Sequence, residues 1–233
     1  ESAFPSDSYA MKSQIDFHDF DPEVDLLQAR VREGETYVRT EDILALIEEH
    51  GDEIATVMMA GINYFSGQLF DMEAITKAAH AKGCMVGFDL AHAAGNAPLQ
   101  LHDWGVDFAV WCNYKYINSG PGAVGSAYIH SRHHSDDSLK RFAGWWGNDP
   151  KTRFQMHLLP DFEASQSADG WQLSNPPIFA MTPIMESMKL FMEAGFSAMR
   201  EKSLKMTAML EQQIDAIEGD QYSILTPRDP KFR

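Results

Sequence analysis

The stretch "CMVGFDLAHAAGNAPLQLHDWGVDFAVWCNYK" (84–115) decides the fold. It contains two apolar runs, 84–90 and 106–113, separated by a connection that ends in the acidic and aromatic "LHDWG". Neither run alternates polar and apolar residues, which is typical of strands that are buried on both faces. We therefore predict two neighbouring buried strands here.

Further elements flank this stretch on both sides. Strands are predicted at "IATVMMAG" (54–61) and "GSAYIH" (125–130). A helix is expected from Thr40, read as its N-cap, and another runs from the N-cap Asp71 to a left-handed stop at Gly83. Alternating helices and apolar strands indicate an α/β fold, a mainly parallel sheet sandwiched by helices.

The two ends of the chain differ from this middle. Residues 1–35 are polar and mixed, whereas 178–218 are helical in pattern and rich in methionine, with a break expected at Gly195. We expect these methionines to pack in a core. We also expect two domains: 1–200 as a large domain that lacks its N-terminal part, and 201–233 as the start of a truncated C-terminal small domain.

Composition excludes several classes of function. A net charge of -15 repels a nucleic acid backbone, so no nucleic acid partner is expected. No secretory signal and no apolar run of membrane-spanning length is present, so no membrane partner is expected either. Cys84 and Cys112 lie in apolar runs and are predicted to be reduced core thiols of a cytoplasmic protein.

An acid and an amine are predicted to lie at one edge of the sheet. Asp89 ends one strand, and Lys115 follows the next strand 26 residues later. Such a pair is either a structural ion pair or the core of a pyridoxal-phosphate (PLP) site. PLP chemistry needs a lysine amine for the imine and an acid that keeps the pyridine nitrogen protonated.

Three other patterns are weaker. Gly120, Gly122 and Gly125 spell G-x-G-x-x-G, but a strand follows where a nucleotide site needs a helix, so we read a turn in the pocket wall. The segment "HSRHHSDDS" (130–138) is predicted to be a solvated loop and no metal site. The pair Trp145–Trp146 either donates to a buried anion or packs in a core.

Several motifs together resemble those of kynureninases. They are "FPSD" (4–7), "GFDLAHAAGN" (87–96), "LHDWGVDFAVWCNYKYINSGPG" (101–122), "GWWG" (144–147) and "SNPPI" (174–178), in the same order as in that family. The resemblance implies a fold type I, PLP-dependent transferase-like large domain and a homodimer with shared active sites. It also implies hydrolysis of L-kynurenine or 3-hydroxykynurenine to anthranilate or 3-hydroxyanthranilate plus L-alanine, in tryptophan catabolism and pyridine nucleotide biosynthesis.

The resemblance also implies residue roles. Lys115 is similar to the Schiff-base lysine, and Asp89 to the partner of the pyridine nitrogen, with Asp7 behind it. Tyr114, a phosphate contact, is expected to be catalytic together with Lys115 and Asp89. The full cofactor-binding set implied is Phe4, Pro5, Ser6, Asp7, Asp89, His92, Tyr114, Lys115, Trp145 and Asn175, with Phe4 stacking on the ring and Asn175 near the substrate's aromatic ring.

Two departures and two rival functions accompany this resemblance. Ala60 stands where some relatives carry a small hydroxyl residue, and no counterpart is found of the upstream phosphate contacts or of the arginine that binds the substrate carboxylate. The chain alone is therefore expected to fail as a kynureninase. The rivals are another fold type I PLP enzyme, such as a cysteine desulfurase, and a non-catalytic scaffold that retains the fold.

Overall fold

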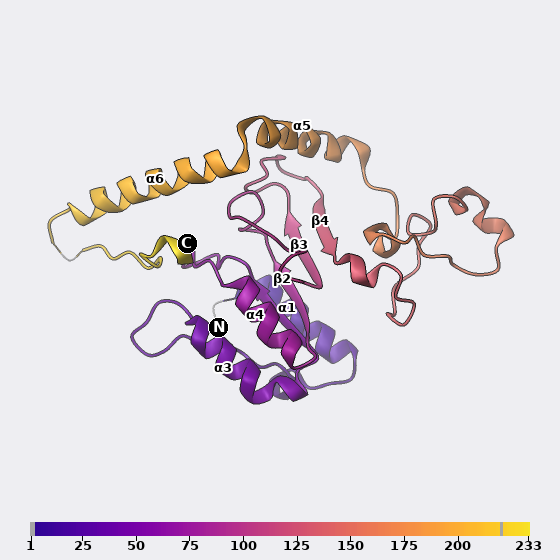
Figure 1. The fold of residues 1–233 in the computed structure, drawn as a ribbon, viewed down its shortest axis with the longest axis horizontal. Helices are drawn as coiled ribbons and strands as arrows, with labels where there is room; N and C mark the ends of the chain where they lie inside the picture. Colours follow the sequence, from indigo (N-terminus) through magenta and orange to yellow (C-terminus); the bar gives the residue numbers. More distant parts are fainter. Residues whose placement is uncertain (1–2, 220) are drawn as a thin grey trace.

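Four short strands form one sheet, as the apolar runs predict. The computed structural model describes residues 3–219 and 221–233. Strands β1 (Thr56–Ala60), β2 (Met85–Asp89), β3 (Phe108–Cys112) and β4 (Gly125–Ile129) lie side by side in chain order. The first three are parallel and β4 is antiparallel to β3, so the sheet is mainly parallel (Figure 1). Ala60 lies opposite Asp89, and Asp89 opposite Val110, which brings the carboxyl ends of the three strands to one edge.

Two amphipathic helices pack beside the sheet. Helix α3 (Thr40–His50) buries Ile43 and Ile47, and α4 (Met72–Ala81) buries Ile75 among others. The predicted N-cap Asp71 accepts a hydrogen bond from Ala74 N at 3.1 Å. The predicted cap Thr40 is wrong by one position: Thr40 is the first helical residue, and the cap position is Arg39, which makes no side-chain cap bond.

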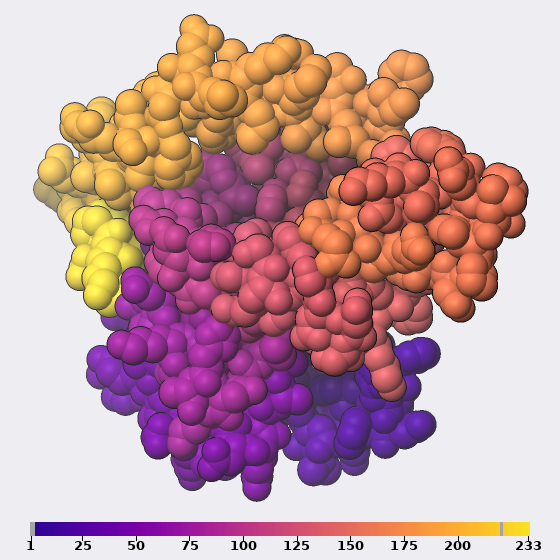
Figure 2. Space-filling view, turned by 45° about the vertical axis from the view of Figure 1, so that its right-hand side comes forward, coloured from indigo at the N-terminus to yellow at the C-terminus, as the bar shows by residue number. Residues whose placement is uncertain are grey.

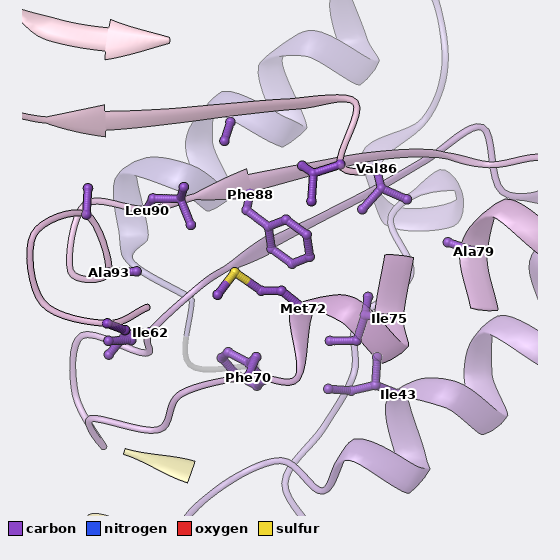
Figure 3. Packing of buried hydrophobic residues seen from close by; sticks show 14 of the residues in the cluster. Ile43, Ile62, Phe70, Met72, Ile75, Ala79, Val86, Phe88, Leu90 and Ala93 are labelled. Atoms are coloured by element: carbon purple, nitrogen blue, oxygen red, sulfur yellow. The ribbon is translucent and has the colours of Figure 1, made fainter. Parts of the chain in front are cut away.

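The core lies between β2 and these helices. Its centre is fully buried and consists of Phe88, Ile75, Leu90 and Val86, which Figure 3 shows converging from β2 and α4. Gly87 is required by close packing, because a Cβ there would lie 2.1 Å from the Phe108 ring. At about 25 cal/mol per Å² of buried apolar surface, this cluster is the main source of stability of the sheet.

The N-terminal segment contains helices that the sequence pattern does not reveal. Helix α1 (Pro5–Phe17) starts with proline at its first position and has Asp7 in its first turn. A second short helix, α2 (Pro22–Asp25), follows it. No residue of α1 is buried, so there is no apolar stripe for periodicity to detect.

The methionine-rich region forms two consecutive helices. Helix α5 (Ile178–Ala194) and helix α6 (Phe196–Asp215) meet at Gly195, whose φ of 77° confirms the predicted break. Ile184 and Met188 pack against the core, and Ser187 Oγ donates to the Ile117 carbonyl. The prediction that the methionines form a core is wrong for this region, since five of them are exposed: Met181, Met185, Met192, Met206 and Met209.

Residues 131–177 leave the sheet after β4 and return at α5. They contain short 3-10 helices, η2 (Ser131–His133), η3 (Arg153–Leu158) and η4 (Ala168–Trp171), and stand out from the body in Figures 1 and 2. The glycines of "GWWG" allow two backbone segments to touch. A Cβ on Gly144 would lie 2.2 Å from Leu173 O, and one on Gly147 would lie 2.9 Å from Gln172 O.

The last residues return to the first half of the chain. Leu69 N donates to Phe232 O at 2.9 Å, and Thr36 Oγ1 donates to Leu225 O at 3.0 Å. The 3-10 turn η5 (Pro230–Phe232) lies at this contact. Helix α6 runs through residue 200 without interruption. The domain boundary expected between residues 200 and 201 stays a prediction.

Among residues 3–219 and 221–233, no helix is both long and apolar enough to cross a membrane.

Candidate active site

A cavity of about 510 Å³ opens at the carboxyl ends of β1, β2 and β3. This is the edge at which α/β sheets bind ligands, and the volume suits a small cofactor with its substrate. Its lining brings together residues predicted separately from the sequence: Phe4, Asp7, Asp89, His92, Tyr114 and Lys115.

The amine of Lys115 lies within this cavity. Its Nζ is 2.9 Å from His92 Nε2 and 5.8 Å from the centre of the Phe4 ring. Within the described part of the chain, no carboxylate forms a salt bridge with Lys115, so the structural ion pair with Asp89 considered above is not formed. The amine is therefore paired with a histidine inside the cavity and not with a carboxylate.

Two carboxyl groups line the same cavity as this amine. Asp89, at the end of β2, accepts a hydrogen bond from Ala91 N at 2.6 Å. Asp7, from the first turn of α1, is hydrogen-bonded to Asp89. Burial, the charge of Asp89 and its hydrogen bond together raise the pKa of Asp7 to about 6, although the charge of Lys115 opposes them. Asp7 therefore keeps its proton to a higher pH than an ordinary aspartic acid does.

His92 lies beside the Lys115 amine and is near enough to Asp89 to be affected by its charge. Burial lowers its pKa, the positive charge of Lys115 lowers it further, and Asp89 acts in the opposite direction. The imidazole is thus neutral at physiological pH and presents a flat, uncharged face. Its backbone carbonyl is held by Asn96 Nδ2 at 3.1 Å.

The last residues of β3 complete one wall. Tyr114 lines the cavity, and its pKa is raised chiefly by a hydrogen bond with the Cys112 thiol. Cys112 is half-buried and also lines the cavity, so its prediction as a core thiol is wrong, because β3 ends there and opens toward the pocket. Cys84 is buried as predicted and donates to Gly51 O at 3.4 Å.

Some residues of the predicted set lie outside the lining of this cavity. Ser6 lines it, whereas Pro5, Trp145 and Asn175 do not. The Trp145 ring lies against Trp146 at 5.2 Å, in the segment that leaves the sheet, and Asn175 is exposed near the end of that segment. Their roles toward a cofactor remain predictions.

The sequence did not single out Tyr64 or Trp111, which both line the cavity. Tyr64 follows β1 at the same carboxyl edge as Asp89. That position is the signal that could have identified it, because the residues just after parallel strands face the ligand site.

A second polar cluster lies at the opposite end of β3. Burial acts to raise the pKa of Asp107, but hydrogen bonds from His80, His133, Arg132 and Val86 N outweigh it and bring that pKa to about 2. The prediction of a solvated loop is therefore wrong at His133. Its side chain is only 13% exposed, and its Nε2 lies 2.7 Å from Asp107 Oδ1. No group of three or more metal-ligating side chains occurs in the described ranges.

The lining fits PLP. Lys115 would provide the amine for the imine, Asp7 and Asp89 would provide the acid for the ring nitrogen, and Phe4 would provide an aromatic face. Hydroxyl groups of Ser6, Ser126 and Tyr114 are available for the phosphate, while Ala60, also in the lining, offers none.

Comparison with known proteins gives the relationship. Residues 27–231 match the model of the family "Aminotransferase class-V". The chain is 55% identical to a kynureninase of Myxococcus xanthus, over 99% of this chain and 54% of that protein. It is 52% identical to a kynureninase of Koribacter versatilis, over 100% of this chain and 54% of that protein. The chain thus spans about half the length of these curated relatives.

Solved structures show the same fold. A cysteine desulfurase of Thermococcus onnurineus aligns with a TM-score of 0.66 at 17% identity, covering 87% of this chain and 47% of that one. An alanine–glyoxylate aminotransferase of Nostoc aligns with a TM-score of 0.59 at 18% identity, covering 83% and 47%. The family match, the fold and the lysine-and-acid cavity agree: the chain belongs to the aminotransferase class-V family of PLP-dependent enzymes.

Proposed function

We propose that this chain is the cofactor-binding part of a kynureninase, which hydrolyses L-kynurenine or 3-hydroxy-L-kynurenine to the aromatic amino acid and L-alanine. The observation that carries the proposal is the identity of about one half to curated kynureninases along nearly the entire chain. The cavity supports it, because seven of the ten cofactor-binding residues implied by that resemblance line it, among them one amine and two carboxyl groups.

Each residue has a defined task in this proposal. Lys115 attaches the cofactor and, when the substrate amine has replaced it, moves the proton at the substrate's α-carbon. Asp89, backed by Asp7, holds a proton at the ring nitrogen. PLP, when bound, supplies the electron sink for charge that develops at that α-carbon. Tyr114, next to Lys115, donates a hydroxyl proton to the phosphate or to the leaving side of the substrate.

The proposal includes a homodimer with shared active sites in the cytoplasm, acting in tryptophan catabolism and pyridine nucleotide biosynthesis. Trp145 and Asn175 support shared sites, since both belong to the implied cofactor-binding set and neither lines the cavity of its own chain. A second subunit would bring them to the site. The substrate carboxylate would be bound by an arginine, which is the side chain best suited to a bidentate contact.

Cysteine desulfurase is the nearest rival, and the shared fold does not distinguish the two functions. A desulfurase needs a nucleophilic thiol that can move to the substrate. Cys112 is fixed at the end of β3 and Cys84 is buried in the core, which favours kynureninase.

The test uses the full-length protein reconstituted with PLP. Kynurenine should be converted to fluorescent anthranilate, and cysteine should release no sulfide. Borohydride should fix the cofactor on Lys115, and Lys115→Ala should abolish both labelling and turnover, whereas Lys151→Ala, at an exposed position, should change neither. Sulfide release without anthranilate, or label on another lysine, would overturn the proposal.

A further inference from the structure

An aromatic pair from two distant parts of the chain forms one side of the cavity. The rings of Phe4 and Tyr64 meet edge to face, with centres 5.2 Å apart and planes at 78°. This is a favoured arrangement for aromatic side chains. Both residues line the cavity, and the Lys115 amine also lies over the Phe4 ring, 5.8 Å from its centre.

Phe4 has little else to hold it in place. It is 46% exposed and precedes α1, a helix with no buried residue. Its carbonyl accepts hydrogen bonds from Asp7 N and Ser8 N, but these bonds lie within the same segment. Two interactions join this segment to the sheet side of the cavity: that of Asp7 with Asp89 and the ring contact of Phe4 with Tyr64.

Tyr64, in contrast, belongs to a rigid loop. Ile62 and Leu69 pair across the base of this loop as an isolated β-bridge. Asn63 Oδ1 accepts hydrogen bonds from Phe65 N and Ser66 N, each at 2.9 Å, and closes the turn.

The buried Gln68 fastens the loop to the segment before α3. Its side chain accepts from Val38 N at 3.1 Å and donates to Val38 O at 2.5 Å. Such buried, satisfied polar groups fix a loop firmly. A side chain on this loop can therefore orient a less constrained one.

We infer that Tyr64 is a positioning residue of the cofactor site: it fixes the Phe4 ring over the Lys115 amine and so prepares the face on which the cofactor stacks. This inference rests on the proposed PLP site and adds a residue to it. The phenol hydroxyl is not needed for the task, because the contact is between the rings.

The experiment measures the PLP affinity of the full-length apo-protein by absorbance titration, together with the visible circular dichroism of the bound cofactor. Tyr64→Ala and Tyr64→Leu should weaken PLP about threefold to tenfold and reduce the dichroism, as loss of one aromatic pair predicts. Tyr64→Phe should match the wild type. Tyr9→Ala is the matched control, since Tyr9 is an exposed aromatic residue on α1, close in sequence to Phe4, and does not line the cavity.

A second background tests whether Tyr64 acts through Phe4. In Phe4→Leu protein, Tyr64→Leu should change PLP affinity by less than about twofold. The inference would be overturned if Tyr64→Leu left PLP affinity unchanged or if Tyr64→Phe weakened it. It would also be overturned if Tyr64→Leu had an equal effect on PLP affinity in the wild-type and Phe4→Leu backgrounds. A wild-type protein that binds no PLP would instead refute the proposed function, so the two failures are distinguishable.

Discussion

Asp7 carries a charge that is costly in the folded protein. Burial and the neighbouring Asp89 raise its pKa from 3.8 to about 6, so the folded state holds this proton over a range where the unfolded state has lost it. A raised carboxyl pKa therefore makes the folded protein less stable as pH rises from about 4 to about 7.

We expect Asp7→Asn to remove this loss in the apo-protein. The difference between the melting temperatures of the variant and the wild type should be larger, in favour of the variant, at pH 7.5 than at pH 5. The reason is that the amide does not ionise. Thermal unfolding at these two pH values measures the difference. Asp16→Asn, an exposed position on the same helix, should leave the pH dependence as in the wild type, and a parallel shift at both pH values in Asp7→Asn would contradict the assignment.

Single residues could be predicted from the sequence where the strand order fixes them. Lys115 and Asp89 were expected at one edge because each follows an apolar run, and the cavity brings them together. Strand order could not place Asp7 beside Asp89, since that depends on how a solvent-exposed helix docks on the sheet; only the family resemblance implied it. The opening of the pocket beside Cys112 likewise depends on where β3 ends.

At the scale of elements, one buried carboxylate joins three pieces of structure. Asp107 accepts hydrogen bonds from His80 at the end of α4, from Val86 N in β2 and from Arg132 and His133 in η2. It thereby ties the amino end of β3 to its neighbours, on the side of the sheet away from the cavity.

Asp107→Asn should cost about 3 kcal/mol of unfolding free energy, because it leaves several donors without a charged acceptor. Denaturant unfolding of the 233-residue chain measures it. Asp103→Asn is the control: its carboxylate is 75% exposed and pairs with the exposed His102, and such surface pairs contribute less than about 1 kcal/mol. Equal costs for the two variants would show that the network is not the source of the stability.

Elements were predictable in proportion to their periodicity. The four strands and the helices α3, α4, α5 and α6 were expected because each has either an apolar run or an apolar face, and all are present. Helix α1 was not expected, because it buries nothing and is set by Pro5 and local turn geometry. The cap of α3 shifted by one residue, a difference that side-chain type alone does not resolve.

For the molecule as a whole, some large apolar side chains are buried in the core and others are almost fully exposed to solvent. Phe179 is 92% exposed and Met192 is 84% exposed, both on α5, whereas Met72 is buried in the core. The sequence could not separate these cases, since an apolar helix has the same composition whether or not something covers it.

We expect Phe179→Ser to change the unfolding free energy of the 233-residue chain by less than about 0.5 kcal/mol, as for other exposed sites. Met72→Ala should cost about 2–5 kcal/mol, because it empties part of the core. Chemical denaturation monitored by tryptophan fluorescence measures both changes in unfolding free energy. A large cost of Phe179→Ser in this chain would show that its ring is packed in solution.

The return of residues 221–233 to the loop that carries Tyr64 has a mechanical consequence. Phe232 O is held by Leu69 N at the base of that loop, and a Cβ on Gly67 would touch Thr226. Tension applied at Arg233 would therefore reach the rim of the cavity within a few bonds, without passing through the hydrophobic core. A pulling handle or a bulky fusion attached there would change the shape of the cavity. The same group attached near Met156, on the segment that leaves the sheet, would not.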